Sequence, residues 1–290
     1  MNLTNVLASV GAAVQETRKL ACVEEVIGED GMSYCKECGE PLLLGLDITG
    51  PMAERLGKKR YVPRNCACMR LMFAEQDLRE QRKKQEENKA RMRRENLKAE
   101  RYRNSTFSKD DGGCEKLRNF CEKYVANYKE MMENNLGLAF VGSNGTGKTF
   151  WASCIANALI DEGATVYMST LTSLIQDMNA NYGENRKPLE RKIKNVDFLI
   201  IDDYGAERGT EYSLEQAFEI LDARYSVGKP LIITANLTEE ILKNPPTLNY
   251  ARSYSRVLEM CPVIVRVEGE RRSKIAEEKR KEFAKLLKGE

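Results

Sequence analysis

The sequence predicts an α/β domain built on a parallel sheet with helices on both faces. Three observations predict it: apolar strands alternate with helical segments from about residue 114 to 270, one strand leads into a glycine-rich loop, and another ends in two carboxylates. Strands that alternate with helices favour parallel pairing, because each crossover lays a helix on a face of the sheet. The chain of 290 residues is long enough for this domain and a smaller module.

The elements of this domain follow one another in alternation. The predicted strands are short apolar runs that cover residues 136–142, 164–169, 196–203, 230–236 and 262–268. The predicted helices lie before and between them and cover residues 116–133, 148–161, 171–180 and 213–227. We place the domain at residues 104–270 and expect residues 271–290 to form a charged C-terminal helix with one apolar side.

Two further segments precede the domain. Residues 1–70 begin with a mildly amphipathic lead-in over 1–30 that predicts a short helix, and continue with closely spaced cysteines. The stretch 31–70 is too small to bury a core of its own, so it needs a staple such as a metal. Residues 71–103 contain no proline or glycine and are rich in charged residues and glutamine, which predicts one long polar helix. The sequence RNSTFSKDDGG (103–113) then ends that helix.

The composition excludes some classes of function and location. Hydrophobic residues make up 42% and charged residues 31%, and the net charge is only +2, so a nucleic-acid site has to be a local patch. No apolar run is long enough to span a membrane, and the N-terminus lacks the pattern of a secretory signal. We therefore expect a cytoplasmic protein whose thiols stay reduced.

The sequence GSNGTGKT (142–149) fits the phosphate-binding pattern G-x-x-x-x-G-K-[ST] between a strand and a helix. Its glycines let backbone N–H groups face phosphate oxygens, and the helix N-terminus adds a positive dipole end. Lys148 is expected to reach the β- and γ-phosphates, and Thr149 to ligate Mg²⁺. The residues predicted to bind ATP here are Gly142, Ser143, Asn144, Gly145, Thr146, Gly147, Lys148, Thr149 and Phe150.

Two later strands end in polar side chains at the same predicted edge of the sheet. In FLIIDDYG (198–205), Asp202 is expected to hold Mg²⁺ and Asp203 to polarise the attacking water. Asn236, at the end of LIITAN, is placed to orient that water. The alternatives are a solvated acidic turn for the two carboxylates and a simple turn former for the asparagine. The sequence thus predicts a site for ATP hydrolysis with catalytic residues Lys148, Asp203 and Asn236.

Arg252 and Arg256 in ARSYSRVLEMC lie four residues apart, and therefore on one helical face. Two arginines on a helix are usually only solvated. Here they follow the water-orienting asparagine at the distance expected for an arginine that acts on the γ-phosphate of a neighbouring subunit. We predict Arg256 as that arginine finger and Arg252 as its support.

At this point the motifs resemble those of one family over residues 100–272. The chain is similar to bacterial and phage replicative helicase loaders of the DnaC/DnaI type, which are AAA+ ATPases with an IstB-like ATP-binding core. The resemblance rests on RYRNSTF (101–107), GSNGTGKT, LIIDDYG, ITAN, the two arginines of RSYSR, and GERR (269–272). It implies that RYRNSTF lines the adenine pocket, with Phe107 as the candidate residue. GERR matches the family's closing element only in part, which leaves a sensor role for Arg271 or Arg272 open.

The resemblance also implies a function. Such loaders bind the hexameric replicative helicase through the N-terminal region, contact single-stranded DNA through an ATP-dependent oligomer, and release on hydrolysis. The basic stretch NRKPLERKIK (185–194) is a candidate DNA contact, but a solvated basic surface explains it equally well, since only Tyr182 lies nearby as an aromatic platform. Its charged residues are Arg186, Lys187, Arg191, Lys192 and Lys194. Two alternatives remain open: an IstB-like helper of DNA transposition, and an adaptor that binds ATP only as a structural switch.

Four cysteines form two close pairs, CxxC and CxC, in a chain without histidine. Thiolates bind zinc tetrahedrally, and four of them close a structural site. Gly39 after the second cysteine suits the tight turn of a zinc knuckle. A redox CxxC and four unrelated thiols are the competing interpretations, but the strand pattern of a thioredoxin-like motif is missing. The predicted zinc ligands are Cys35, Cys38, Cys66 and Cys68, whereas Cys154 and Cys261 lie in apolar stretches and are predicted to be buried thiols.

Overall fold

The structure is a computed structural model, and it describes residues 24–50, 53–54, 58–180, 187–205, 210–245 and 247–288. The chain divides into two compact units, Met1–Glu86 and Glu87–Glu290, called here the cysteine unit and the sheet unit. Within the described residues no helix is both long and apolar enough to cross a membrane.

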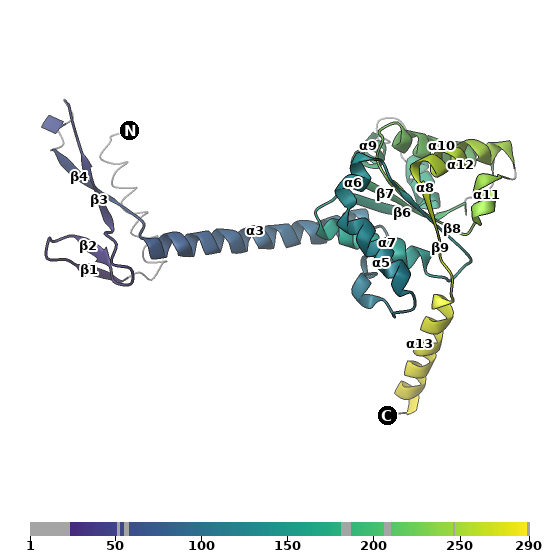
Figure 1. The fold of residues 1–290 in the computed structure, drawn as a ribbon, viewed down its shortest axis with the longest axis horizontal. Helices are drawn as coiled ribbons and strands as arrows, with labels where there is room; N and C mark the ends of the chain where they lie inside the picture. Colours follow the sequence, from purple (N-terminus) through teal and green to yellow (C-terminus); the bar gives the residue numbers. More distant parts are fainter. Residues whose placement is uncertain are drawn as a thin grey trace. The chain divides into compact units, whose positions relative to one another are not determined.

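The described part of the cysteine unit is built from two short hairpins (Figure 1). Strand β1 (Glu25–Ile27) pairs antiparallel with β2 (Ser33–Cys35), and β3 (Leu43–Asp47) pairs antiparallel with β4 (Lys59–Pro63). The expected helical lead-in over 1–30 is therefore wrong at residues 25–27, which form a strand because they pair with the cysteine-bearing strand; residues 1–23 lie outside the described residues.

Helix α3 (Ala67–Asn96) is the long polar helix, and it begins four residues before the predicted start at 71. It ends at Asn96 rather than 103 because Leu97 is buried in the sheet unit and its backbone bridges to Met168. A separate short helix, α4 (Glu100–Arg103), follows. Tertiary burial of one leucine thus overrides a sequence that favours continuous helix.

The sheet unit contains a five-stranded sheet in the order β6-β7-β8-β5-β9, in which neighbouring strands pair parallel. The predicted parallel sheet is confirmed. Its strands are β5 (Leu138–Val141), β6 (Val166–Thr170), β7 (Phe198–Tyr204), β8 (Leu231–Ala235) and β9 (Val263–Arg266).

Helices cover both faces of this sheet (Figure 1). Their bounds are α5 (Glu115–Ala126), α6 (Tyr128–Glu133), α7 (Lys148–Asp161), α8 (Leu171–Ala180), α9 (Lys187–Asn195), α10 (Glu211–Tyr225), α11 (Glu239–Lys243), α12 (Leu248–Met260) and α13 (Arg271–Lys288), with a 3₁₀ turn η1 at Phe107–Lys109. The helix predicted over 116–133 is divided at Asn127, which separates α5 from α6.

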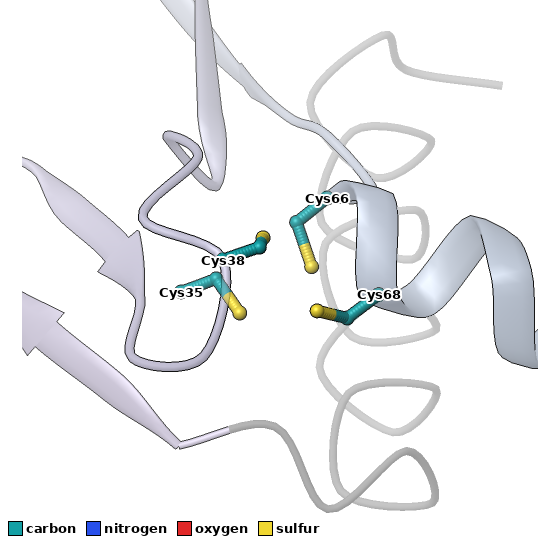
Figure 2. A group of neighbouring side chains, drawn as sticks. All are labelled: Cys35, Cys38, Cys66 and Cys68. Atoms are coloured by element: carbon teal, nitrogen blue, oxygen red, sulfur yellow. The ribbon is translucent and has the colours of Figure 1, made fainter.

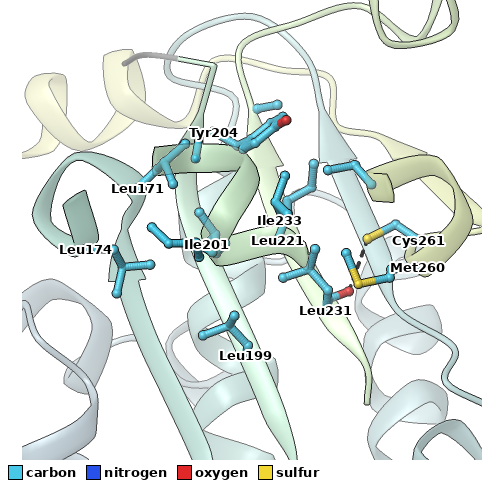
Figure 3. Close-up of a cluster of buried hydrophobic side chains, with 14 of the residues drawn as sticks. Leu171, Leu174, Leu199, Ile201, Tyr204, Leu221, Leu231, Ile233, Met260 and Cys261 are labelled. Atoms are coloured by element: carbon cyan, nitrogen blue, oxygen red, sulfur yellow. Dashed lines mark hydrogen bonds between the residues drawn. The ribbon is translucent and has the colours of Figure 1, made fainter. Parts of the chain in front are cut away.

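Alternate residues of each strand point to opposite faces, and this alternation divides the core in two. Leu138 and Phe140 of β5 pack with α5 and α7, whereas Ala139 and Val141 pack with the cluster formed by α8, α10 and α12. Figure 3 shows this second cluster, in which the Cys261 thiol donates to the carbonyl oxygen of Leu231 at 3.2 Å. Both faces of β5, β6, β7 and β8 are therefore largely buried, which leaves the ends of these strands for polar side chains.

The buried side chains include one arginine. Arg224 of α10 is 0% exposed, and its guanidinium donates to the carbonyl oxygens of Ile193, Val196, Asp197 and Pro230. These carbonyls belong to the segments that enter β7 and β8. Because buried carbonyls without donors are costly, Arg224 fixes the starting points of the two strands that carry the acidic and amide site residues.

Candidate functional site

The candidate site lies where β5, β7 and β8 end. The loop after β5 turns into α7 through glycines with backbone angles that other residues avoid: Gly147 has φ +103° and directly precedes the helix. A Cβ on Gly142 would lie 2.4 Å from the carbonyl oxygen of Val267. The loop therefore needs glycine at these positions for two separate reasons, backbone angle and close approach.

Lys148 and Thr149 occupy the first turn of α7. The Lys148 ammonium donates to the carbonyl oxygens of Gly142 and Ser143 at 2.9 and 2.7 Å, and burial lowers the pKa of this group. The Thr149 hydroxyl donates to Asp202 at 2.7 Å. The loop thus places a cation and a hydroxyl beside the acidic end of β7, although the residues are more than fifty positions apart.

The end of β7 is irregular, and this irregularity aims the two carboxylates. Pairing with β8 shifts register between Ile201 and Tyr204, and Asp203 adopts a left-handed φ of +54°. Its N–H donates to the Thr234 hydroxyl at 3.0 Å, which holds the unusual backbone in place. A bulge of this kind lets neighbouring side chains face the same edge instead of opposite faces.

Asp202 is completely buried and accepts four hydrogen bonds from the chain. Oδ1 accepts from Thr149 and Thr234 at 2.7 and 2.6 Å, and Oδ2 accepts from Tyr102 and Arg101 at 2.9 Å each. The sequence analysis missed Arg101, Tyr102 and Thr234. Arg101 and Tyr102 lie about 100 positions before Asp202, and Thr234 lies 32 positions after it, so no local spacing links them to this carboxylate. The presence of Arg101 and Tyr102 in the RYRNSTF motif is the one signal in the sequence that could have pointed to them.

Asp203 and Asn236 line one cavity of about 320 Å³ together with Lys148 and other residues of the phosphate loop, called here the Lys148 cavity. Burial and the neighbouring Asp202 raise the pKa of Asp203 above that of an ordinary aspartate. The cavity is lined by Arg101, Ser105, Asn144, Gly145, Gly147, Lys148, Thr149, Phe150, Asp203, Asn236, Arg271, Arg272 and Ile275. The hydroxyl and carboxylate oxygens present here are the donors that Mg²⁺ prefers, so the site fits the predicted metal.

The first turn of α13 also lies against the phosphate loop. The backbone N–H of Arg272 donates to Gly145 O at 3.1 Å. Arg271 lies over the Phe150 ring at 3.5 Å and pairs with Asp110 and Asp111. Both arginines line the cavity, so the partial GERR motif is located beside the residues predicted to bind the nucleotide, and its sensor role stays a prediction.

The two predicted finger arginines lie on α12. Arg252 is exposed, while Arg256 pairs with Asp222 at 3.2 Å and lies over the Tyr225 ring at 3.8 Å. Neither belongs to the lining of the Lys148 cavity among the residues that the structure describes. The predicted action of Arg256 on a neighbouring subunit does not require it to lie in this cavity. That action stays a prediction.

The remaining predicted contacts lie around the site. Phe107 begins η1 and packs near Trp151, with ring centroids 6.4 Å apart; among the described lining residues of the cavity, Ser105 is present and Phe107 is not. The described part of the basic stretch is α9, where Lys192 lies over the Tyr167 ring at 4.5 Å. Tyr182 and Arg186 fall outside the described residues.

The cysteine unit brings its four predicted ligands together. Figure 2 shows Cys35 and Cys38 on one side and Cys66 and Cys68, at the start of α3, on the other, with their sulfurs converging. The four sulfur atoms all lie within 4.8 Å of one another. Tetrahedral zinc with Zn–S bonds of about 2.3 Å places its sulfurs about 3.8 Å apart, so the group fits zinc in donor type, number and spacing.

The surroundings of the cysteines favour a closed site. Gly39 has φ +68° and its N–H donates to Cys35 O at 2.8 Å, which forms the tight turn expected of a zinc knuckle. A backbone hydrogen bond at Glu40 lowers the pKa of the Cys38 thiol to about 6. The Glu40 carboxylate accepts from the N–H of Ala67 at 2.9 Å, and so ties the turn to the first residue of α3.

Fold and site together define a class of protein. The parallel α/β sheet, the glycine-rich loop with Lys148 and Thr149, and the acidic end of β7 are those of a P-loop nucleotide-binding domain. A family model described as IstB-like ATP binding protein matches residues 68–251, which is more than half of the chain. This chain belongs to the IstB-like ATP-binding protein family.

Individual proteins also show sequence similarity to this chain. The replicative helicase loader DnaC of Escherichia coli strain K12 is 30% identical over 146 residues, which cover 49% of this chain and 60% of that protein. The protein YdaV of the same strain is 30% identical over 116 residues, covering 39% of this chain and 47% of that protein. The chain thus spans between about half and 60% of the length of these two relatives.

Among solved structures, the crystal structure of the DnaC helicase loader has a TM-score of 0.50 and 26% sequence identity, and covers 59% of this chain and 100% of that chain. The predicted fold class, an AAA+ type α/β domain with a parallel sheet, is confirmed by the observed strand order and this likeness. The predicted resemblance to the DnaC type of loader and to IstB-like proteins is confirmed as well.

Proposed function

We propose that this protein is an ATP-dependent loader that binds a replicative DNA helicase and helps to place it on single-stranded DNA. The observation that carries the proposal is the similarity of this chain to DnaC, both in sequence and over the whole length of the DnaC crystal structure. A loader needs a nucleotide switch and a docking element. The Lys148 cavity supplies candidate residues for the first, and the cysteine unit is our candidate for the second.

The switch that we propose is ATP hydrolysis in the Lys148 cavity. Lys148 binds the β- and γ-phosphates, and Thr149 and Asp202 hold Mg²⁺, which when bound neutralises charge on the phosphate oxygens. Asp203 polarises the attacking water, and Asn236 orients it. Support for these roles comes from the shared cavity, in which Lys148, Asp203 and Asn236 are all lining residues. The neighbouring Phe107 is our candidate for contact with adenine.

We further propose that the site is completed by a second copy of the chain. Arg256, supported by Arg252, would reach the γ-phosphate of the adjacent subunit in an ATP-dependent oligomer. A mixing experiment tests this. Arg256→Ala binds ATP but lacks the finger, while Lys148→Ala keeps the finger but cannot bind ATP; each alone should be inactive, and their mixture should regain turnover. A mixture no more active than its separate components would contradict the role in trans.

The cysteine unit is proposed to bind one zinc ion through Cys35, Cys38, Cys66 and Cys68 and to dock on the helicase. Its metal requirement is supported by the small buried cluster of its described residues, which consists of Cys35, Leu42, Cys66 and Met69. Contact with single-stranded DNA is proposed for the basic stretch 185–194, where Lys187, Arg191 and Lys194 lie on α9. We propose the cytoplasm as the location of the protein, because a loader has to reach the replicative helicase and its DNA there.

Co-purification tests the loader role. A tagged chain, loaded with zinc and supplied with Mg²⁺ and a slowly hydrolysed ATP analogue, should retain a replicative helicase. Cys66→Ser with Cys68→Ser should lose the helicase but keep nucleotide binding, whereas Cys114→Ser, at an exposed thiol, should keep both. If no helicase is retained by the intact chain, the loader role is wrong.

A second function is favoured by one observation, the match of residues 68–251 to the IstB-like family model. A helper of DNA transposition would use the same nucleotide site but would retain a transposase instead of a helicase. The same co-purification therefore separates the two roles. The cysteine unit, which we do not expect in a transposition helper, is the reason that we favour the loader.

A further inference from the structure

The carboxylate of Asp202 has no acceptor position left for another donor. A carboxylate offers about four lone-pair positions. Thr149 and Thr234 fill those of Oδ1, and Arg101 and Tyr102 fill those of Oδ2. A hydrated metal ion that interacts with this carboxylate must therefore displace one of the four donors.

The four donors differ in how firmly the fold holds them. Tyr102 is 1% exposed and Thr234 is completely buried, while the Thr149 hydroxyl is itself a predicted metal ligand. Arg101 is the charged donor of the four, and its side chain is 58% exposed. Its guanidinium also lies 3.7 Å from Asp203, so one cation serves both carboxylates. Arg101 is therefore the donor that can leave most easily and the one that competes most directly with a cation.

The backbone that carries Arg101 is anchored independently of the two carboxylates. The Asn157 side-chain amide donates to the carbonyl oxygens of Tyr102 and Ser105 at 2.7 and 2.9 Å. Arg93, near the end of α3, donates in turn to Asn157 Oδ1 at 3.1 Å. The Arg101 side chain can thus swing away while α4 stays attached to α7.

We propose that Arg101 is a displaceable counter-ion that sets the magnesium affinity of the nucleotide site. It neutralises Asp202 and Asp203, and Mg²⁺ that arrives with the nucleotide has to replace it. This inference rests on the proposed binding of Mg²⁺ and adenine nucleotide in the Lys148 cavity. It makes Arg101 a positioning residue, since it acts on the metal through the carboxylates.

The test measures binding of ADP, so that hydrolysis plays no part. Trp151 is the single tryptophan of the chain and lies two residues after Thr149, and its fluorescence reports the site, with a fluorescently labelled ADP as a second signal. At saturating ADP, Arg101→Gln should lower the Mg²⁺ concentration at half-saturation about five- to tenfold, as expected when a half-exposed competing charge is removed. Binding of ADP in EDTA should weaken, because the two carboxylates then repel the phosphates.

Arg103→Gln is the matched control. Arg103 lies on the same short helix and carries the same charge, but it donates to the carbonyl oxygen of Leu97. It should leave the Mg²⁺ midpoint unchanged. Arg101→Lys, which keeps the charge, should give a midpoint near that of the wild type, and it keeps the test informative if the glutamine variant folds poorly.

Each other outcome overturns the proposal. An unchanged midpoint in Arg101→Gln means that Arg101 has only a structural role, and equal loss of ADP affinity with and without Mg²⁺ means that it contacts phosphate directly. An equal shift in Arg103→Gln means that only the general charge matters. If the wild-type chain binds no ADP with Mg²⁺, the proposed function itself is wrong, and the inference is wrong with it.

Discussion

The cysteine unit and the sheet unit differ most in what their residues can bury. The cysteine unit gathers Cys35, Leu42, Cys66 and Met69 in its buried cluster, and half-exposed side chains such as Leu44 and Tyr61 cover its second hairpin. The sheet unit buries both faces of β5, β6, β7 and β8 beneath helices, in two large clusters. Apolar burial can support the sheet unit alone, whereas the small described core of the cysteine unit is what makes us propose a metal there. If that proposal holds, ligand binding contributes to folding in the cysteine unit and to the proposed function in the sheet unit.

The largest effect is expected from the zinc ligands. Cys66→Ser with Cys68→Ser should reduce bound zinc from about one ion per chain to nearly none and unfold the cysteine unit, because metal binding supplies its folding free energy. Metal analysis and thermal unfolding measure this. The sheet unit should unfold at the same temperature as before. If it unfolds with the cysteine unit, the independence of the two units is wrong.

The next effect belongs to the core of the sheet unit. Arg224→Met fits the space but leaves the carbonyl oxygens of Ile193, Val196, Asp197 and Pro230 without their donor, which should cost about 2–4 kcal/mol of unfolding free energy. Urea unfolding measures the loss. Zinc content is the control and should not change. A gain in stability would mean that burying the charge costs more than its hydrogen bonds return.

A smaller effect on stability, but a large one on turnover, is expected at Asp203. Asp203→Asn should lower ATP turnover about 100-fold or more, because the amide cannot polarise water as the carboxylate does. ADP affinity should change little. The unfolding temperature should stay the same or rise slightly, since a charge beside Asp202 is removed. Asp47→Asn in the cysteine unit is the control. If Asp203→Asn hydrolyses ATP at the wild-type rate, the proposed role of Asp203 in polarising water is wrong.

Surface ion pairs should contribute least, and equally in both units. Arg118 pairs with Glu122 at 2.9 Å in the sheet unit, and Lys36 pairs with Glu24 in the cysteine unit, with side chains at least 38% exposed in each pair. Arg118→Gln and Lys36→Gln should each shift the relevant unfolding midpoint by less than about 2 °C. A larger shift for Lys36→Gln alone would show that the cysteine unit draws stability from its surface.

The sequence predicted what depends on local patterns. The strand–loop–helix order around Lys148 and the spacing of the cysteine pairs follow from residue types at fixed separations, and the alternation of apolar strands gave the parallel sheet. The confirmed burial of Cys154 and Cys261 follows from their apolar neighbours.

What the sequence could not predict depends on contacts between distant residues. Arg101 meets Asp202 across 101 positions, and no periodicity marks such a pair. The end of α3 is decided by Leu97, whose burial against the sheet outweighs helix propensity. The hairpins of the cysteine unit escaped notice because their strands, such as Glu25–Ile27, are short and exposed and lack an alternating pattern.

The left-handed backbone at Asp203 has a consequence for anyone who redesigns this protein. A glycine would adopt φ +54° without the penalty that aspartate carries, typically about 1 kcal/mol or more. Asp203→Gly is therefore a candidate for a more stable variant that lacks the carboxylate proposed to polarise water. Selection for thermal stability alone would favour that replacement, so a screen for more stable variants should also measure ATP turnover at every round.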